Sequence, residues 1–119
     1  MTEPESDGVS PLDADEFLQR VRGDIALAGA MAQLFCSEYP RQLDVVRRAI
    51  ATNDASAVEQ AVHALRGAVM NFSAEPAARE AARLEVMGRT GDLTGAVAAL
   101  RALEAELDRL ALALREMTS

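Results

Sequence analysis

The chain contains one histidine, His63, and one cysteine, Cys36, among its 119 residues. Imidazole is largely neutral near pH 7, so one ring nitrogen can act as a nucleophile while the other keeps its proton. A zinc site built from Cys and His needs more ligands than these two residues supply. A di-iron helical bundle needs Glu-x-x-His pairs on two helices, which a single histidine excludes. A lone histidine is most often an ordinary core or surface residue, and it can act as a nucleophile only if it faces solvent.

The helix predicted over residues 55–72 carries the histidine outside its apolar stripe. The stripe follows the spacing i, +3, +4, +7, +11 and +14, and its members are Val58, Ala61, Val62, Leu65, Val69 and Phe72. On a helical wheel that starts at Val58, His63 lies at roughly 140° and Gly67 at roughly 180°. Both therefore point away from the core. His63 is then either an ordinary surface residue or one that is held out for a partner.

The neighbours of His63 favour the second interpretation. A glycine inside a helix costs ~1 kcal/mol relative to alanine, and Gly67, one turn after His63, leaves bare backbone beside the ring. Ala64 is small and Met70 is apolar on the outer face, so we expect both to belong to a docking surface. Arg66, three residues after His63, can place its guanidinium beside a phosphate on the ring.

The ring nitrogen that does not react needs an acceptor for its proton. Glu59, one turn before His63 on the same face, is the first candidate, and Gln60 is the second. The alternative for both residues is an ordinary solvated polar face.

Charge and composition restrict the class of protein. The net charge is −7 and all 12 cationic residues are arginine, which disfavours binding to nucleic acid. Cys36 cannot form an intrachain disulfide, and no apolar run reaches the ~18 residues of a membrane span. We therefore expect a cytoplasmic protein without metal or cofactor. The polar start at Met1, which has no signal-peptide pattern, favours a free-standing protein.

The pattern of caps and breaks predicts an all-α antiparallel four-helix bundle with a short extra N-terminal helix. Residues 1–11 have the composition of a disordered acidic tail, and residues 12–119 form the domain. The short first helix is expected to begin with a capping box at Asp13 and Glu16 and to end at Gly23. The next three helices are expected to start at Asp24, Asp54 and Pro76 and to end near Ile50, Phe72 and Met87, with Gly88 and Gly91 ending the third of them. The last helix is expected to start at Asp92.

Two of these helices allow a further expectation. In the helix after Asp24, the apolar residues before Pro40 (Leu27, Met31, Leu34) are rotated by roughly a right angle from those after it (Leu43, Val46, Ile50). One kinked helix is favoured over two abutting helices. The last helix has an apolar repeat every three or four residues, formed by Leu93, Val97, Leu100, Leu103, Leu107, Leu110 and Leu114.

The run His63-Ala64-Leu65-Arg66-Gly67-Ala68 resembles the H-x-L-(K/R)-G-(S/A) signature of histidine-containing phosphotransfer (HPt) domains of bacterial two-component phosphorelays. The resemblance extends from about residue 13 to residue 116. It includes Phe35 with Pro40, Asp54, and the run 84–92, which is similar to L-E-x-x-G-(K/R)-x-G-(D/N). The chain departs from the pattern at Ala68, where serine is frequent, and at Ser73, where glycine is usual. Arg66 stands where lysine is commoner, which keeps the charge.

This resemblance implies a phosphoryl carrier without turnover of its own. His63 would exchange a phosphoryl group with the aspartate of a receiver domain, in a response regulator or a hybrid histidine kinase, and the receiver would carry the Mg²⁺. A histidine kinase is a second source of phosphate, and the family resemblance suggests a monomer. The alternative is a helical interaction module that binds and inhibits a receiver or kinase without taking phosphate. The cognate partner, the direction of phosphate flow and the cellular response stay open, as does whether the chain is part of a larger sensor.

Overall fold

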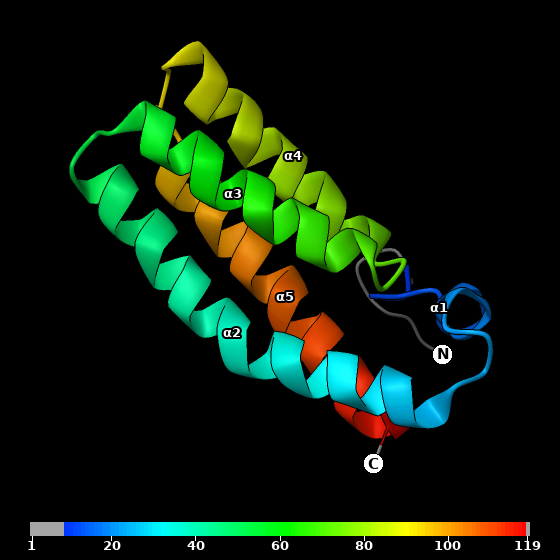
Figure 1. Cartoon of the computed structure of the whole chain (residues 1–119). Helices are drawn as coiled ribbons and strands as arrows, with labels where there is room; N and C mark the ends of the chain where they lie inside the picture. The colour runs from blue at the N-terminus through cyan, green and yellow to red at the C-terminus, as the bar shows by residue number, and fades with distance from the viewer. Residues whose placement is uncertain (1–8, 119) are drawn as a thin grey trace.

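The computed structural model describes residues 9–118, which fold into four long helices and one short helix at the end of the bundle (Figure 1). The helices are α1 (Ala14–Arg20), α2 (Ile25–Ala51), α3 (Ala55–Met70), α4 (Glu75–Thr90) and α5 (Ala96–Thr118). Consecutive long helices run antiparallel, and α2 also packs against α5, which closes the bundle. None of the helices in this part of the chain combines the length and apolar composition needed to cross a bilayer. The predicted all-α bundle with a short extra helix is confirmed.

Three aspartates start three of the helices, as their positions in the sequence predict. Asp13, Asp24 and Asp54 each accept the backbone N–H three residues later, at 3.0, 2.9 and 3.1 Å. Each such cap satisfies a helix donor and stabilises its helix by about 1 kcal/mol. α4 starts without a side-chain cap, and a proline, Pro76, occupies its first turn.

α2 is one helix that continues through Pro40, so the alternative of two abutting helices is wrong. Leu27 and Leu34, which belong to the apolar set before Pro40, are 45% and 63% exposed. Small residues such as Ala28 and Ala32 occupy the buried face there instead. Together with these alanines, the buried residues form one continuous stripe along α2. The buried face of the helix therefore does not turn by a right angle at Pro40, as the bulky residues alone had indicated.

The last two helices differ from expectation near their shared turn. α4 continues through Gly88 and ends at Thr90. It is capped by Gly91, whose φ of +82° is the left-handed conformation typical of a residue after a helix. Asp92 accepts the N–H of Thr94 at 3.0 Å and so caps a turn, while α5 begins only at residue 96. Val97, expected in the apolar stripe of α5, is 55% exposed.

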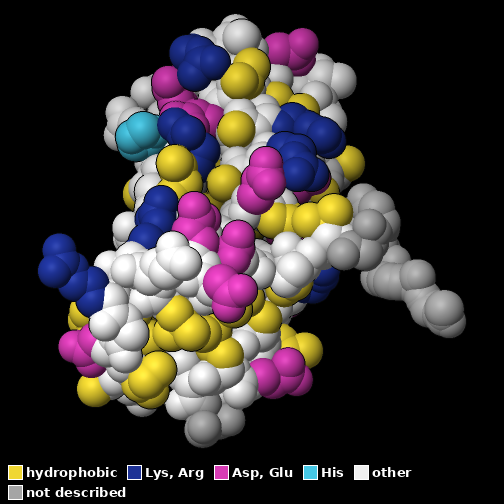
Figure 2. Space-filling model, turned by 90° about the vertical axis from the view of Figure 1, so that its right-hand side faces the viewer, with side chains coloured by type: hydrophobic (Ala, Val, Ile, Leu, Met, Phe, Trp, Pro, Cys, Tyr) yellow, Lys and Arg dark blue, Asp and Glu magenta, His cyan; other side chains and the backbone are white. Residues whose placement is uncertain are grey.

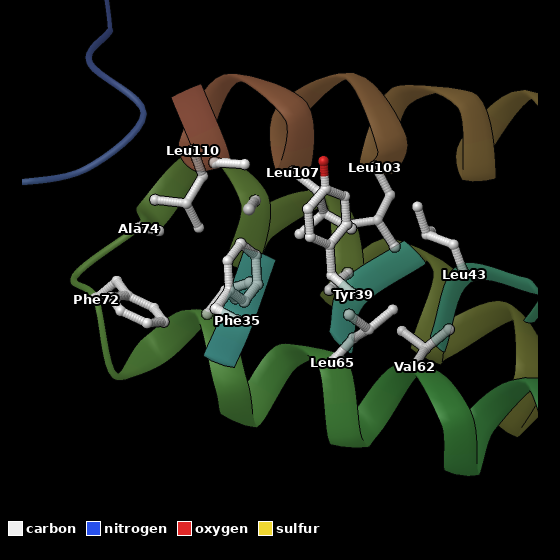
Figure 3. Close-up of a cluster of buried hydrophobic side chains, with 14 of the residues drawn as sticks. Phe35, Tyr39, Leu43, Val62, Leu65, Phe72, Ala74, Leu103, Leu107 and Leu110 are labelled. Atoms are coloured by element: carbon white, nitrogen blue, oxygen red, sulfur yellow. The ribbon is translucent and has the colours of Figure 1, made fainter. Parts of the chain in front are cut away.

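The four aromatic residues of the chain lie in one cluster near α1. Ring centroids are 5.1 Å apart for Phe17 and Phe72, 5.3 Å for Phe72 and Phe35, and 5.0 Å for Phe35 and Tyr39. Figure 3 shows three of these rings among leucines of α3 and α5. Phe17 is fully buried, so the cluster attaches the short helix α1 to the bundle.

The predicted tail covers residues 1–11, of which residues 1–8 lie outside the described residues. The next residues make defined contacts where a disordered segment was expected. The carbonyl of Val9 accepts from Arg109 at 2.6 Å, and the hydroxyl of Ser10 donates to the carbonyl of Leu12 at 2.8 Å. Leu12 is buried, so the chain joins the bundle there.

Tyr39 gives a direct test of this core, because it is the only tyrosine and the chain has no tryptophan. Burial, and then the hydrogen bond that its hydroxyl donates to Asp108 at 2.7 Å, raise the pKa of Tyr39 to about 12. The folded state thus holds this proton more tightly than the unfolded chain, with its ordinary pKa of 10.0. The resulting stabilisation is full below pH 10 and is lost as the pH rises towards 12.

We expect the near-ultraviolet absorbance of the phenolate to appear only near pH 12 in the folded protein. Asp108→Asn removes the carboxylate and should lower the midpoint of that titration. A midpoint near 10 in the unaltered, still folded protein would contradict the buried hydrogen bond.

Candidate functional site

His63 lies in the middle of α3 on its outer face. Its side chain is 68% exposed, whereas Val58, Val62, Leu65 and Val69 on the opposite face are fully buried. Figure 2 shows the histidine, in cyan, at the surface beside basic and acidic side chains. The predicted outward direction of the ring is confirmed.

A carboxylate from the neighbouring helix holds the ring. Nδ1 of His63 lies 2.7 Å from Oε2 of Glu85, which reaches across from α4. Nε of Arg66 donates to the other oxygen, Oε1, also at 2.7 Å. An ionised carboxylate only accepts hydrogen bonds, so Nδ1 must carry the proton. In the neutral ring, Nε2 then carries the free lone pair.

The environment of Glu85 keeps its carboxylate charged. Burial raises the pKa of this carboxyl, but the hydrogen bonds from His63 and Arg66, followed by their charges, outweigh burial and lower it below the ordinary 4.5. Glu85 is therefore an anion at neutral pH. Because its pKa is lower in the folded state, its contribution to stability is present above pH 4.5 and is lost as the pH falls through the lowered value.

The two residues that sequence reasoning offered as acceptors for the ring do not perform this role. Gln60 bonds instead to the hydroxyl of Ser56, at 3.5 Å, and no hydrogen bond joins Glu59 to His63. The acceptor is Glu85, 22 residues along the chain. One signal in the sequence could have indicated it: Glu85 is an acidic residue directly beside the apolar face of α4, where a carboxylate needs partners.

The other predicted site residues lie on the same side of α3, and the structure adds detail to each. Glu85 fixes Arg66 next to His63 and leaves the terminal nitrogens of the guanidinium without another hydrogen bond. Gly67 is exposed, and a Cβ placed there would meet nothing within 4 Å. No packing contact therefore requires this glycine. Ala64 is exposed and Met70 is 48% exposed.

A separate groove lies between α2 and the C-terminal end of α3. Met31 and Leu34 of α2 and Ala68 of α3 are among its lining residues. The sequence pattern did not predict the groove, because a groove between two helices depends on how they pack. The groove is lined by α2 and the C-terminal end of α3, whereas the ring of His63 is held on the side of α3 that faces α4.

Comparison with known proteins identifies one family. The family model described as "Hpt domain" matches residues 30–113, which include all of α3 and α4 with His63 and Glu85. Neither a curated protein nor a solved structure gives a significant match.

The tautomer of His63 tests the geometry of the site without any partner. In the neutral ring, we expect long-range ¹H–¹⁵N NMR of this single histidine to show a protonated Nδ1 and an unprotonated Nε2. Glu85→Gln offers the ring an amide that can present either its oxygen or its NH₂ group, so the two tautomers should become mixed.

Glu59→Gln is the matched control, because it makes the same chemical change one turn from His63 on α3. It should leave the tautomer of the ring as it is. A tautomer that responds to Glu59→Gln and not to Glu85→Gln would contradict the assignment of the acceptor.

Proposed function

Because the chain belongs to the Hpt domain family of phosphotransfer modules in two-component signalling, we propose that His63 accepts a phosphoryl group on Nε2 and exchanges it with the aspartate of a receiver domain. The observation that carries this proposal is the bond between Nδ1 and Glu85. This bond supports a proton on Nδ1 of the exposed ring, which would leave Nε2 free to act as the nucleophile.

The transfer step can be written with the groups on this chain. The lone pair of Nε2 attacks the phosphorus of an aspartyl phosphate, and the bond between phosphorus and the aspartyl oxygen breaks. The aspartate leaves as a carboxylate, and the imidazole, which still has its proton on Nδ1, gains positive charge. The anionic Glu85, 2.7 Å from Nδ1, offsets that charge as it develops. Return transfer runs through the same arrangement in reverse.

Arg66 and the small residues near the ring have separate roles in the proposal. The terminal N–H groups of Arg66 donate to the phosphoryl oxygens on Nε2, while its Nε stays on Glu85. Ala64 and Gly67 leave room for the active site of the receiver to approach the ring. Met70 and the groove beside α2 provide apolar surface for docking.

The receiver would supply the Mg²⁺, which offsets charge on the transferred group. A histidine kinase is a second source of the phosphoryl group. We further propose that the protein carries phosphate without turnover of its own, and that it acts as a monomer in the cytoplasm, where Cys36 stays reduced.

Transfer of radiolabelled phosphate tests this function. Each receiver domain of the source organism, phosphorylated with radiolabelled phosphate through a kinase, is mixed with the unaltered protein and with His63→Gln. We expect at least one receiver to pass acid-labile label to the unaltered chain and none to His63→Gln. Circular dichroism and a binding assay with the same receiver check that the variant is folded and still docks.

Label that moves equally to His63→Gln would rule out His63 as the acceptor. A receiver that binds the unaltered chain and never loses its phosphate to it would favour the alternative, an inhibitory interaction module.

A further inference from the structure

Gly88, buried in α4, packs directly against the backbone of α3. A Cβ built on Gly88 would lie 2.6 Å from the backbone nitrogen of Glu59 and 2.9 Å from the carbonyl oxygen of Ala55. Real Cβ atoms essentially never show contacts under 3.0 Å. Because the colliding atoms belong to the backbone of a helix, they cannot rotate away. Any larger residue at this position must push the two helices apart.

The backbone conformation of Gly88 does not explain the glycine. Gly88 is not among the glycines with positive φ, which in the described part of the chain are Gly23, Gly91 and Gly95. A glycine inside a helix also weakens that helix relative to alanine. The contact with α3 is what requires a residue without a side chain here.

This contact lies one helical turn from the paired side chains on both helices. On α4, Gly88 follows Glu85 by three residues; on α3, Glu59 precedes His63 by four. Both bonds that Glu85 accepts, from His63 and from Arg66, are 2.7 Å long. Such bonds are lost when donor and acceptor separate beyond ~3.5 Å, so a displacement of α4 by about one ångström is enough to break them.

We propose that Gly88 is a positioning residue of the phosphotransfer site, because it sets the spacing of α3 and α4 at which Glu85 reaches both His63 and Arg66. The inference rests on the proposed function for its use in phosphotransfer. Its geometric content, that the tautomer of His63 depends on a residue that does not contact the ring, can be measured on the unphosphorylated protein.

The experiment compares Gly88→Ala with two controls. Gly29→Ala makes the same change inside α2, where a Cβ would meet nothing within 4 Å. Leu103→Ala removes a fully buried side chain of α5 and so lowers stability without forcing helices apart. Each protein is measured for its thermal unfolding midpoint, for the ¹⁵N signals of His63, and for transfer of phosphate from a receiver.

We expect Gly88→Ala to mix the two tautomers of His63 and to slow phosphotransfer by about tenfold, as the loss of one charge-assisted hydrogen bond predicts. Leu103→Ala should keep the Nδ1-protonated form even where its unfolding midpoint falls further. Gly29→Ala should keep that form as well. Unchanged His63 signals in Gly88→Ala would overturn the proposal, as would an equal loss of the tautomer in Leu103→Ala.

Two further results can be interpreted: a Gly88→Ala protein that does not fold, and an unaltered protein that takes no phosphate. If Gly88→Ala does not fold, the same substitution is placed in the Gly29→Ala background, which gains helix stability. Failure to fold there too would overturn the proposal, because Gly88 would then be a requirement of the fold itself. If the unaltered chain takes no phosphate while Gly88→Ala still mixes the tautomers, the proposed function fails and the geometric inference stands.

Discussion

Glu85 gives one carboxylate oxygen to His63 and the other to Arg66, and the rest of the site depends on this shared acceptor. Only 9% of its side chain is exposed, and an unpartnered carboxylate at that depth would be costly. Both donors come from α3, one turn apart on the same helix. The same carboxylate therefore sets the tautomer of the exposed ring and places a cation beside it. One interaction between helices therefore positions both His63, the proposed nucleophile, and Arg66, the proposed phosphate-binding group.

The bundle can present this site because its stability lies elsewhere. On the inner face of α3, Val58, Val62, Leu65 and Val69 are fully buried, and fully burying such a side chain stabilises the fold by roughly 1.5–3 kcal/mol. The aromatic cluster attaches α1 at one end of the bundle. The outer face of α3 carries no part of that core, so it tolerates the bare backbone at Gly67 and leaves the ring accessible.

Local features of the sequence could be predicted because they depend on residues three or four positions apart. The aspartate caps and the outward direction of His63 are of this kind. The acceptor of the ring proton could not, because Glu85 lies 22 residues from His63 and meets it only when α4 packs on α3. Gly88 was predicted to end α4, but it lies inside the helix and contacts α3. The sequence alone does not distinguish a glycine that ends a helix from one that packs against a neighbouring helix. The exposure of Leu34 was missed because alanines, which carry little weight in a hydrophobic pattern, form the buried stripe in that half of α2.

Glu85 holds the proton on Nδ1 and, as we propose, so directs chemistry to Nε2. The position of phosphorus on the ring tests this most directly. In protein with ¹⁵N-labelled histidine, phosphorylated through a receiver or kinase, the coupling between ³¹P and ¹⁵N identifies the nitrogen that carries the phosphoryl group. We expect this nitrogen to be Nε2 of His63. Phosphorus on Nδ1, or on another residue, would contradict it.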